Sequence, residues 1–119
     1  MKSTEDLIFD KITDSAKKRF DYKKFKSTFG ELPKHIPENI LFGIVAGFAT
    51  GESEAEIQTK LSNEILMLGF LFEGNQFQEF LADKKKIFSK EIFVMQTALS
   101  MLDGNDENGA LIFVNQFLD

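Results

Sequence analysis

Residue types that carry most protein chemistry are scarce in this chain of 119 residues. It has one histidine, His35, and no cysteine. His35 lies in the stretch 32–37 with both prolines, so we expect it on an exposed connector, with no second histidine or thiol to join it as nucleophile or metal ligand. The lack of cysteine excludes disulfides, thiolate catalysis and sulfur-ligated zinc. We predict no enzyme activity, no metal site and no cofactor.

Two groups of carboxylates have the residue type needed for acid/base chemistry. Glu52, Glu54 and Glu56 stand at the start of a predicted helix, where free backbone amides and the helix dipole favour negative charge, so capping explains them without a reaction. The second group lies in the loop 103–109. A calcium loop of the EF-hand type needs glycine at its sixth position and glutamate at its twelfth, and a loop starting at Asp103 has asparagine and valine there. We interpret this loop as a polar turn between helices.

A stripe of small residues is the most unusual local pattern. Glycine inside a helix costs roughly 0.5–1 kcal/mol relative to alanine, so Gly43 and Gly47 indicate a close contact that compensates. With Ala46 and Thr50 they form one smooth helix face. We predict a close crossing there, either with a helix of the same bundle near Gly69, or with a docked helix of a partner or second copy. The spacing lacks the lysine and the preceding strand of a phosphate-binding loop.

Charged residues are segregated along the sequence. The net charge is −5, yet residues 17–35 sum to +5 and residues 36–83 to −7. The basic segment contains a set of candidate partner-binding side chains: Lys17, Lys18, Arg19, Lys23, Lys24 and Lys26. Residues 84–86, all lysine, would extend this surface only if the fold brings the two regions together. Lysine is a poor reader of bases, so a nucleic-acid role would rest on backbone contacts with steep salt dependence.

The acidic segment offers a surface of the opposite sign. Its candidates for binding a basic protein are Glu52, Glu54 and Glu56, because negative charge steers association with a basic groove. Overall acidity argues against a general nucleic-acid binder, since non-specific affinity for a polyanion comes mostly from neutralising phosphates. Solubility is the alternative explanation for this charge.

Helical periodicity dominates the elements that would position these residues. Apolar residues every four positions predict a helix over about 4–19, behind a cap at Ser3 or Thr4. Further helices are expected over 22–29, over 38–50 with a stop at Gly51, and from a capping box at Ser53 to about 73. The stretch 76–102 is expected to be helical with a break at Ser89. The last residues are expected to form a short helix, with an edge strand as the alternative. The length fits one domain. We predict an all-α fold, a compact single-domain bundle of five or six short helices over residues 1–119.

Fourteen phenylalanines supply most of the expected core, since the ring brings a large apolar surface and no titratable group. Most of them fall on the apolar stripe of a predicted helix. The others lie in runs where every face is apolar, so that one helix packed on one side cannot cover them: Phe9, Phe42, Phe48, Phe70, Phe93 and Phe113. These positions indicate either helices enclosed by others or a surface that awaits a partner.

The function expected from these observations is that of a small acidic, non-enzymatic protein-binding module, most concretely an inhibitor, immunity or anti-defence protein. Lysine outnumbers arginine thirteen to one, a usage typical of AT-rich coding in a low-GC bacterium, its phage or its plasmid. The first alternative is a nucleic-acid-associated accessory protein that binds through residues 17–34. The second is a small-ligand carrier, or an enzyme that uses surface carboxylates. The sequence leaves a homodimer open.

The expected location is the cytoplasm, because residues 1–16 lack the apolar core of a signal peptide. A membrane span is not expected. The apolar run 40–49 offers about ten residues where roughly twenty are needed.

Overall fold

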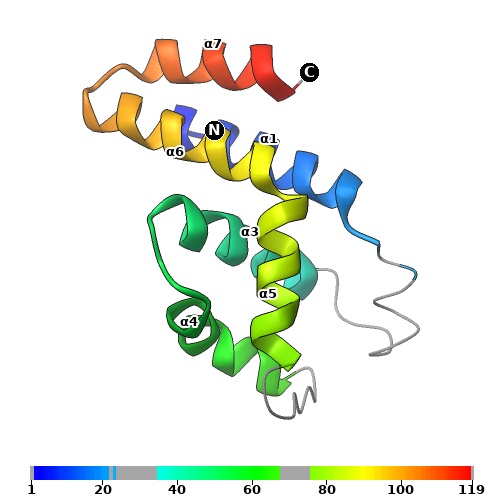
Figure 1. The fold of residues 1–119 in the computed structure, drawn as a ribbon. Coiled ribbons are helices and arrows are strands. Elements are labelled where there is room, and N and C mark those ends of the chain that lie inside the picture. The colour runs from blue at the N-terminus through cyan, green and yellow to red at the C-terminus, as the bar shows by residue number, and fades with distance from the viewer. Residues whose placement is uncertain (1, 22, 24–34, 68–75, 119) are drawn as a thin grey trace.

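The computed structural model describes residues 2–21, 23, 35–67 and 76–118. Within them the backbone forms six helices and no strand, which confirms the predicted all-α fold (Figure 1). The helices are α1 (Thr4–Arg19), α3 (His35–Ala49), α4 (Glu54–Met67), α5 (Gln76–Ile87), α6 (Ser89–Asp103) and α7 (Glu107–Leu118). The short helix predicted over 22–29 lies outside the described residues, as do Lys24, Lys26, Gly69 and Phe70.

Helix α1 has the bounds that its apolar spacing predicts. The Ser3 hydroxyl accepts a hydrogen bond from the backbone amide of Asp6 at 3.1 Å and satisfies one free donor of the first turn. Ile8, Ile12 and Ala16 are fully buried. One face of α1 therefore belongs to the core.

Helix α3 starts earlier than its sequence predicts. It begins at His35, so this residue opens a helix and is not part of a connector. Pro37 is the third residue of α3, in the first turn, where a backbone nitrogen needs no acceptor within the helix and proline is tolerated. The predicted stop at Gly51 is confirmed. Gly51 adopts a φ of +83°, which residues other than glycine rarely adopt.

Hydrogen bonds at the end of α3 form a Schellman motif and lead directly into the cap of α4. The amide of Gly51 donates to the carbonyl of Phe48 at 3.1 Å, and the amide of Glu52 donates to the carbonyl of Gly47 at 2.9 Å. Ser53 then caps α4, accepting from the amide of Glu56 at 3.2 Å. The Glu56 carboxylate accepts from the Ser53 hydroxyl at 3.2 Å, whereas a standard capping box uses the serine amide.

The break between α5 and α6 lies at the predicted place, but its cause differs from the predicted serine cap. Phe88 is the N-cap residue of α6 and makes no side-chain cap hydrogen bond. Its amide donates to the carbonyl of Lys84, and its carbonyl accepts from the amide of Ile92, both at 2.8 Å. Because the Phe88 ring is fully buried, its packing fixes the point where the chain changes direction.

The turn between α6 and α7 is the polar connection that the sequence predicts. Asn105 adopts a φ of +62° and ends α6 in a second Schellman motif, in which the amide of Asp106 donates to the carbonyl of Met101 at 2.9 Å. Asp106 then caps α7 by accepting from the amide of Gly109 at 2.9 Å. The acidity of this loop is thus explained in part by capping. The last element is a helix, not an edge strand.

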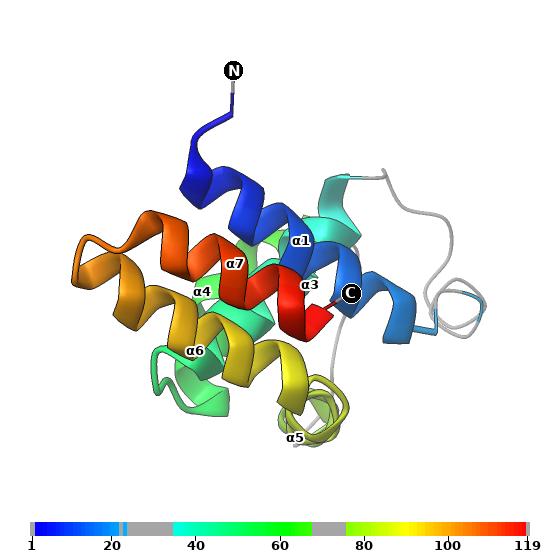
Figure 2. The same ribbon diagram turned by 90° about the horizontal axis from the view of Figure 1, so that it is seen from above.

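The helices form two layers. In the upper layer α7 packs over α1 and α6, which lie side by side, and α3, α4 and α5 form the lower layer (Figures 1 and 2). Helix α6 contacts α1, α3, α5 and α7, while α4 packs chiefly on α3 and α5. Every described helix contributes to one core, which contains these fully buried aliphatic side chains among others: Ile12, Leu41, Ile44, Leu81, Val94 and Val114.

Candidate functional site

Three phenylalanine rings gather on the surface where α6 and α7 lie side by side. The ring centroids of Phe113 and Phe117 are 4.5 Å apart, and Phe93 lies 6.3 Å and 6.0 Å from them. Phe93 is 51% exposed and Phe117 is 43% exposed. We call Phe93, Phe113 and Phe117 the aromatic face. It is an apolar surface of mutually contacting rings that the described part of the chain covers only in part.

The stretches of α6 and α7 that carry the aromatic face contain no charged residue. No charged residue occurs between positions 92 and 102 or between 108 and 118, although charged residues make up 28% of the chain. The other exposed side chains on these stretches include Gln96, Ser100 and Gln116. Protein interfaces combine exposed aromatic residues with depletion of charge in the same way.

The sequence anticipates this face in part. Phe93 and Phe113 belong to the six phenylalanines expected to mark either enclosed helices or a surface that awaits a partner, and both are part of the aromatic face. The sequence pattern places Phe117 on a core stripe, but the structure exposes it because α7 packs chiefly on α1 and α6 among the described helices. The sequence of α7 has apolar residues around much of the helix, and this width could have indicated that some of them, such as Phe117, stay exposed when one side of the helix is buried.

The other phenylalanines of that set have different environments. Phe48 is buried in the core. Phe42 is exposed and makes an edge-on contact with Phe9, with ring centroids 5.5 Å apart. These two rings border a depression of about 260 Å³ between α1 and α3, whose rim carries Asp6 and Asp10.

The fold brings the lysines of α5 next to the described end of the basic segment, at the end of α1. The Lys84 ammonium lies 5.5 Å from the ring centroid of Phe20, the residue that follows α1. Lys84 also lies over Phe80, and Lys85 lies 5.3 Å from the ring centroid of Phe48. The exposed lysines at the ends of α1 and α5 and at the start of α6 form what we call the basic junction: Lys18, Lys23, Lys85, Lys86 and Lys90.

Two candidates from the basic segment are held in ion pairs. The Lys17 ammonium lies 2.5 Å from Glu38 Oε1 on α3 and 3.6 Å from Asp14. The hydrogen bond with Glu38 raises the pKa of Lys17 above its ordinary value. Arg19 Nε lies 2.7 Å from Oε1 of the fully buried Glu91. Lys17 and Arg19 thus tie α1 to α3 and α6.

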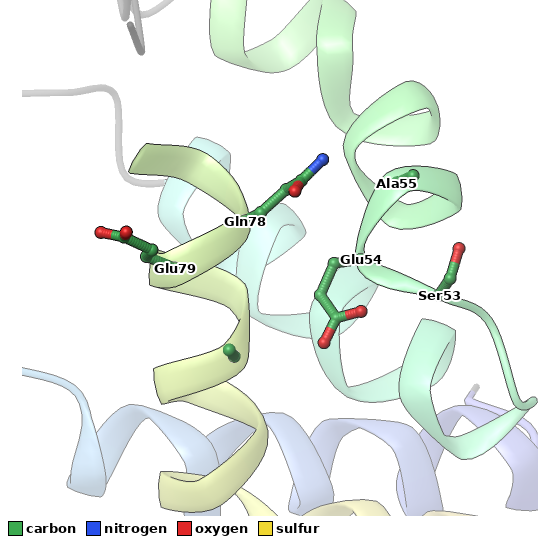
Figure 3. A pocket seen from close by; sticks show the side chains of 6 residues that line it. Ser53, Glu54, Ala55, Gln78 and Glu79 are labelled. Atoms are coloured by element: carbon green, nitrogen blue, oxygen red, sulfur yellow. The ribbon is translucent and has the colours of Figure 1, made fainter. Parts of the chain in front are cut away.

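The three acidic candidates have separate roles. Glu52 is mostly buried and pairs with Lys60, while Glu56 takes part in the cap of α4. Glu54 borders a shallow depression of about 420 Å³ between α4 and α5, and Gln78 faces it from the other side (Figure 3). That these residues bind a basic protein stays a prediction.

The glycine stripe contacts a helix of the same chain. A Cβ atom built on Gly43 would lie 2.7 Å from Leu61 Cδ2, and one built on Gly47 would lie 2.6 Å from Ile57 Cγ1. Both neighbours belong to α4. The Thr50 hydroxyl turns back to its own helix and donates to the carbonyl of Ala46 at 2.9 Å. The close crossing that the glycines predict is therefore present between α3 and α4. Docking of an external helix on this stripe stays a prediction.

Within the described ranges no three histidine, aspartate or glutamate side chains are grouped so that they could hold a metal ion. None of the helices described there has the length and apolar character needed to cross a membrane. Comparison of the chain with models of known families, with curated proteins and with solved structures gave no match.

Proposed function

We propose that this protein is a non-enzymatic protein-binding module that contacts its partner through the aromatic face. The observation that supports this is the cluster of three rings, two of them about half exposed, on stretches of α6 and α7 that contain no charged residue. Phe93 and Phe117 are each about half exposed, and burying the exposed half of either ring is worth roughly 1 kcal/mol. Phenylalanine is among the residues that are enriched in protein interfaces relative to the rest of the surface.

The carboxylates favour this proposal over an enzyme. Glu52, Glu56 and Asp106 each have a structural partner, and Glu91 is buried beneath Arg19. A general acid or base must reach a substrate. That the module acts as an inhibitor, immunity or anti-defence protein, in the cytoplasm of a low-GC bacterium, stays a prediction from the sequence.

Photo-crosslinking in the producing cell tests the proposed face. A photoreactive residue placed at Gln96 or Gln116 should give a discrete crosslinked protein, whereas one placed at the exposed Glu5 of α1 should not. Combining either probe with Phe93→Ser and Phe117→Ser should remove the product. Leu7→Ser is the matched control, because Leu7 is equally exposed but lies on α1. Products that are the same from all three probes would contradict the proposal.

A second candidate function is binding of a nucleic-acid backbone through the basic junction. The contact of Lys84 with Phe20 favours it, because this contact places the lysines of α5 beside the end of α1. Phosphates attract such a cluster even on a chain of net charge −5.

Fluorescence anisotropy with a labelled DNA or RNA duplex at low salt tests this candidate. We expect weak binding, and the triple variant Lys85→Gln, Lys86→Gln, Lys90→Gln should lower the salt slope by about one unit for each phosphate that is no longer neutralised. The control variant Lys2→Gln, Lys11→Gln, Lys60→Gln has the same net charge. Equal weakening of binding in both variants, or no binding at low salt, would exclude the basic junction as a nucleic-acid-binding surface.

A further inference from the structure

Exposed residues of α6 form complementary pairs about the middle of the helix, so two antiparallel copies of α6 would bring each residue opposite its complement. Lys90 and Asp103, both exposed, lie equally far from the midpoint between positions 96 and 97. Phe93 and Ser100, also exposed, are symmetric about the same midpoint. One pair joins opposite charges and the other joins a large side chain with a small one.

We propose that the aromatic face binds a second copy of this chain, with the two α6 helices antiparallel around a two-fold axis beside Gln96. This rests on the proposed function, and it names the partner. A two-fold axis places each residue of one copy opposite its mirror position in the other. Lys90 then meets Asp103 of the second copy, and Phe93 packs over the small Ser100.

The distribution of charge favours a second copy over an unrelated partner. Two chains of net charge −5 repel each other over most of their surfaces. The stretches 92–102 and 108–118 carry no charge, so two copies can approach here with little repulsion. At the margins each copy presents a positive end at Lys90 and a negative end at Asp103 and Glu107, all exposed. Antiparallel pairing joins these ends favourably.

The size of the face sets the strength that is expected. A helix of 15 residues is about 22 Å long, and two neighbouring helices present a strip roughly 20 Å wide. Such a strip buries on the order of 900 Å² over both copies, which is below the roughly 1,200 Å² of stable complexes. We therefore expect a reversible dimer with a Kd in the micromolar range.

Sedimentation velocity of the full chain between about 5 and 500 µM, concentrations that bracket a micromolar Kd, tests the proposal. Wild type should shift from monomer to dimer, and Phe93→Ser should weaken the dimer by about tenfold or more. Leu7→Ser should leave it unchanged. Circular dichroism of each variant shows whether it remains folded.

Charge exchange tests the antiparallel arrangement. Lys90→Asp and Asp103→Lys should each weaken self-association, because each places like charges opposite one another. An equimolar mixture of the two variants should form a heterodimer, since both cross-contacts are then between opposite charges. A monomer at every concentration, or single variants that pair as well as wild type, would overturn the proposal. If wild type is monomeric while Phe93→Ser still removes a crosslink to a different protein, this inference fails and the proposed function stands.

Discussion

The carboxylate of Glu91 is fully buried. Oε1 accepts from Arg19 Nε at 2.7 Å and from the Ser15 hydroxyl at 2.8 Å. Oε2 is buried as well, and the described residues offer it no donor. Removing one member of a buried pair costs more than replacing both, because the remaining charge loses its compensation.

Single and double substitutions of this pair should therefore be strongly non-additive. We expect Arg19→Met to lower the free energy of unfolding by about 1–3 kcal/mol, a range reduced because Arg19 is partly exposed. Adding Glu91→Met should recover most of that stability. Urea unfolding of the two single variants and the double variant measures the coupling, and Lys18→Met serves as an exposed control. Additive effects would show that Glu91 does not depend on Arg19.

The role of Arg19 could not be predicted from the sequence. Its place among lysines indicates a solvated face, and its acceptor lies 72 positions later on another helix. On α6 the structure buries positions 91, 94, 95 and 98 and leaves Ile92 and Leu99 partly exposed. Four of the described helices contact α6, so its buried face is wide and includes the polar Glu91.

At the scale of elements, the α3–α4 crossing depends on the absence of two side chains. Gly47 faces Ile57, a β-branched residue whose clashing atom is close to the backbone. Gly43 faces only a terminal methyl group of Leu61, which a rotamer change can move. The two glycines therefore differ in how strictly they are required.

Substituting these glycines by alanine should separate the two contacts. Gly47→Ala should destabilise the protein by about 1–3 kcal/mol despite the gain in helix propensity. Gly43→Ala should cost less. Gly104→Ala should be close to neutral, since the nearest atom to its added Cβ is 3.5 Å away and its φ is −85°. Thermal and urea unfolding give the order, and a neutral Gly47→Ala would contradict the crossing.

Helix ends are the most predictable elements of this chain. Ser3, Gly51 and Ser53 act locally, through hydrogen bonds or φ within a few residues, so the sequence carries their signals directly. Phe88 acts through burial among distant helices, which leaves no local sequence signal. The nearby serine therefore gives the only local signal at the α5–α6 break, and the sequence predicts a serine cap there. The start of α3 is harder to predict because Pro37 fits any position of a first turn.

On the scale of the whole molecule, stability is unevenly distributed between helices. Helix α6 contacts four other helices, whereas α4 contacts chiefly α3 and α5. The described part of α4 supplies two buried side chains, Ile57 and Leu61, to the core. Elements with few buried contacts open at lower free energy than the global transition.

Native-state hydrogen exchange should resolve this difference. Amides in the middle of α3 and α6 should exchange only on global unfolding, and those of α4 should exchange through a smaller opening. Ile57→Val should accelerate exchange in α4 more than in α6. Equal protection in α4 and α6 would indicate instead that these helices unfold together in one cooperative unit.

The all-α class follows from periodicity alone, but the layering does not. That α1 lies against α6 and α7, or that Lys84 reaches Phe20, depends on contacts between distant positions that no local pattern encodes. The aromatic face could be predicted from the sequence only in part. Two of its rings stand out in the sequence as candidates for exposure, and the third depends on how few helices surround α7.

The packing of α1 against α6 and α7 also governs when the protein can fold during its synthesis. At typical elongation rates of about 5–20 residues per second, the synthesis of α1 ends roughly 5–20 s before that of α7. Over that interval Ile8, Ile12 and Ala16 lack two of the helices that bury them. The buried face of α1 is therefore completed only after the residues of α7 have been synthesised, so stable packing of α1 follows the synthesis of α7 even where single helices form early.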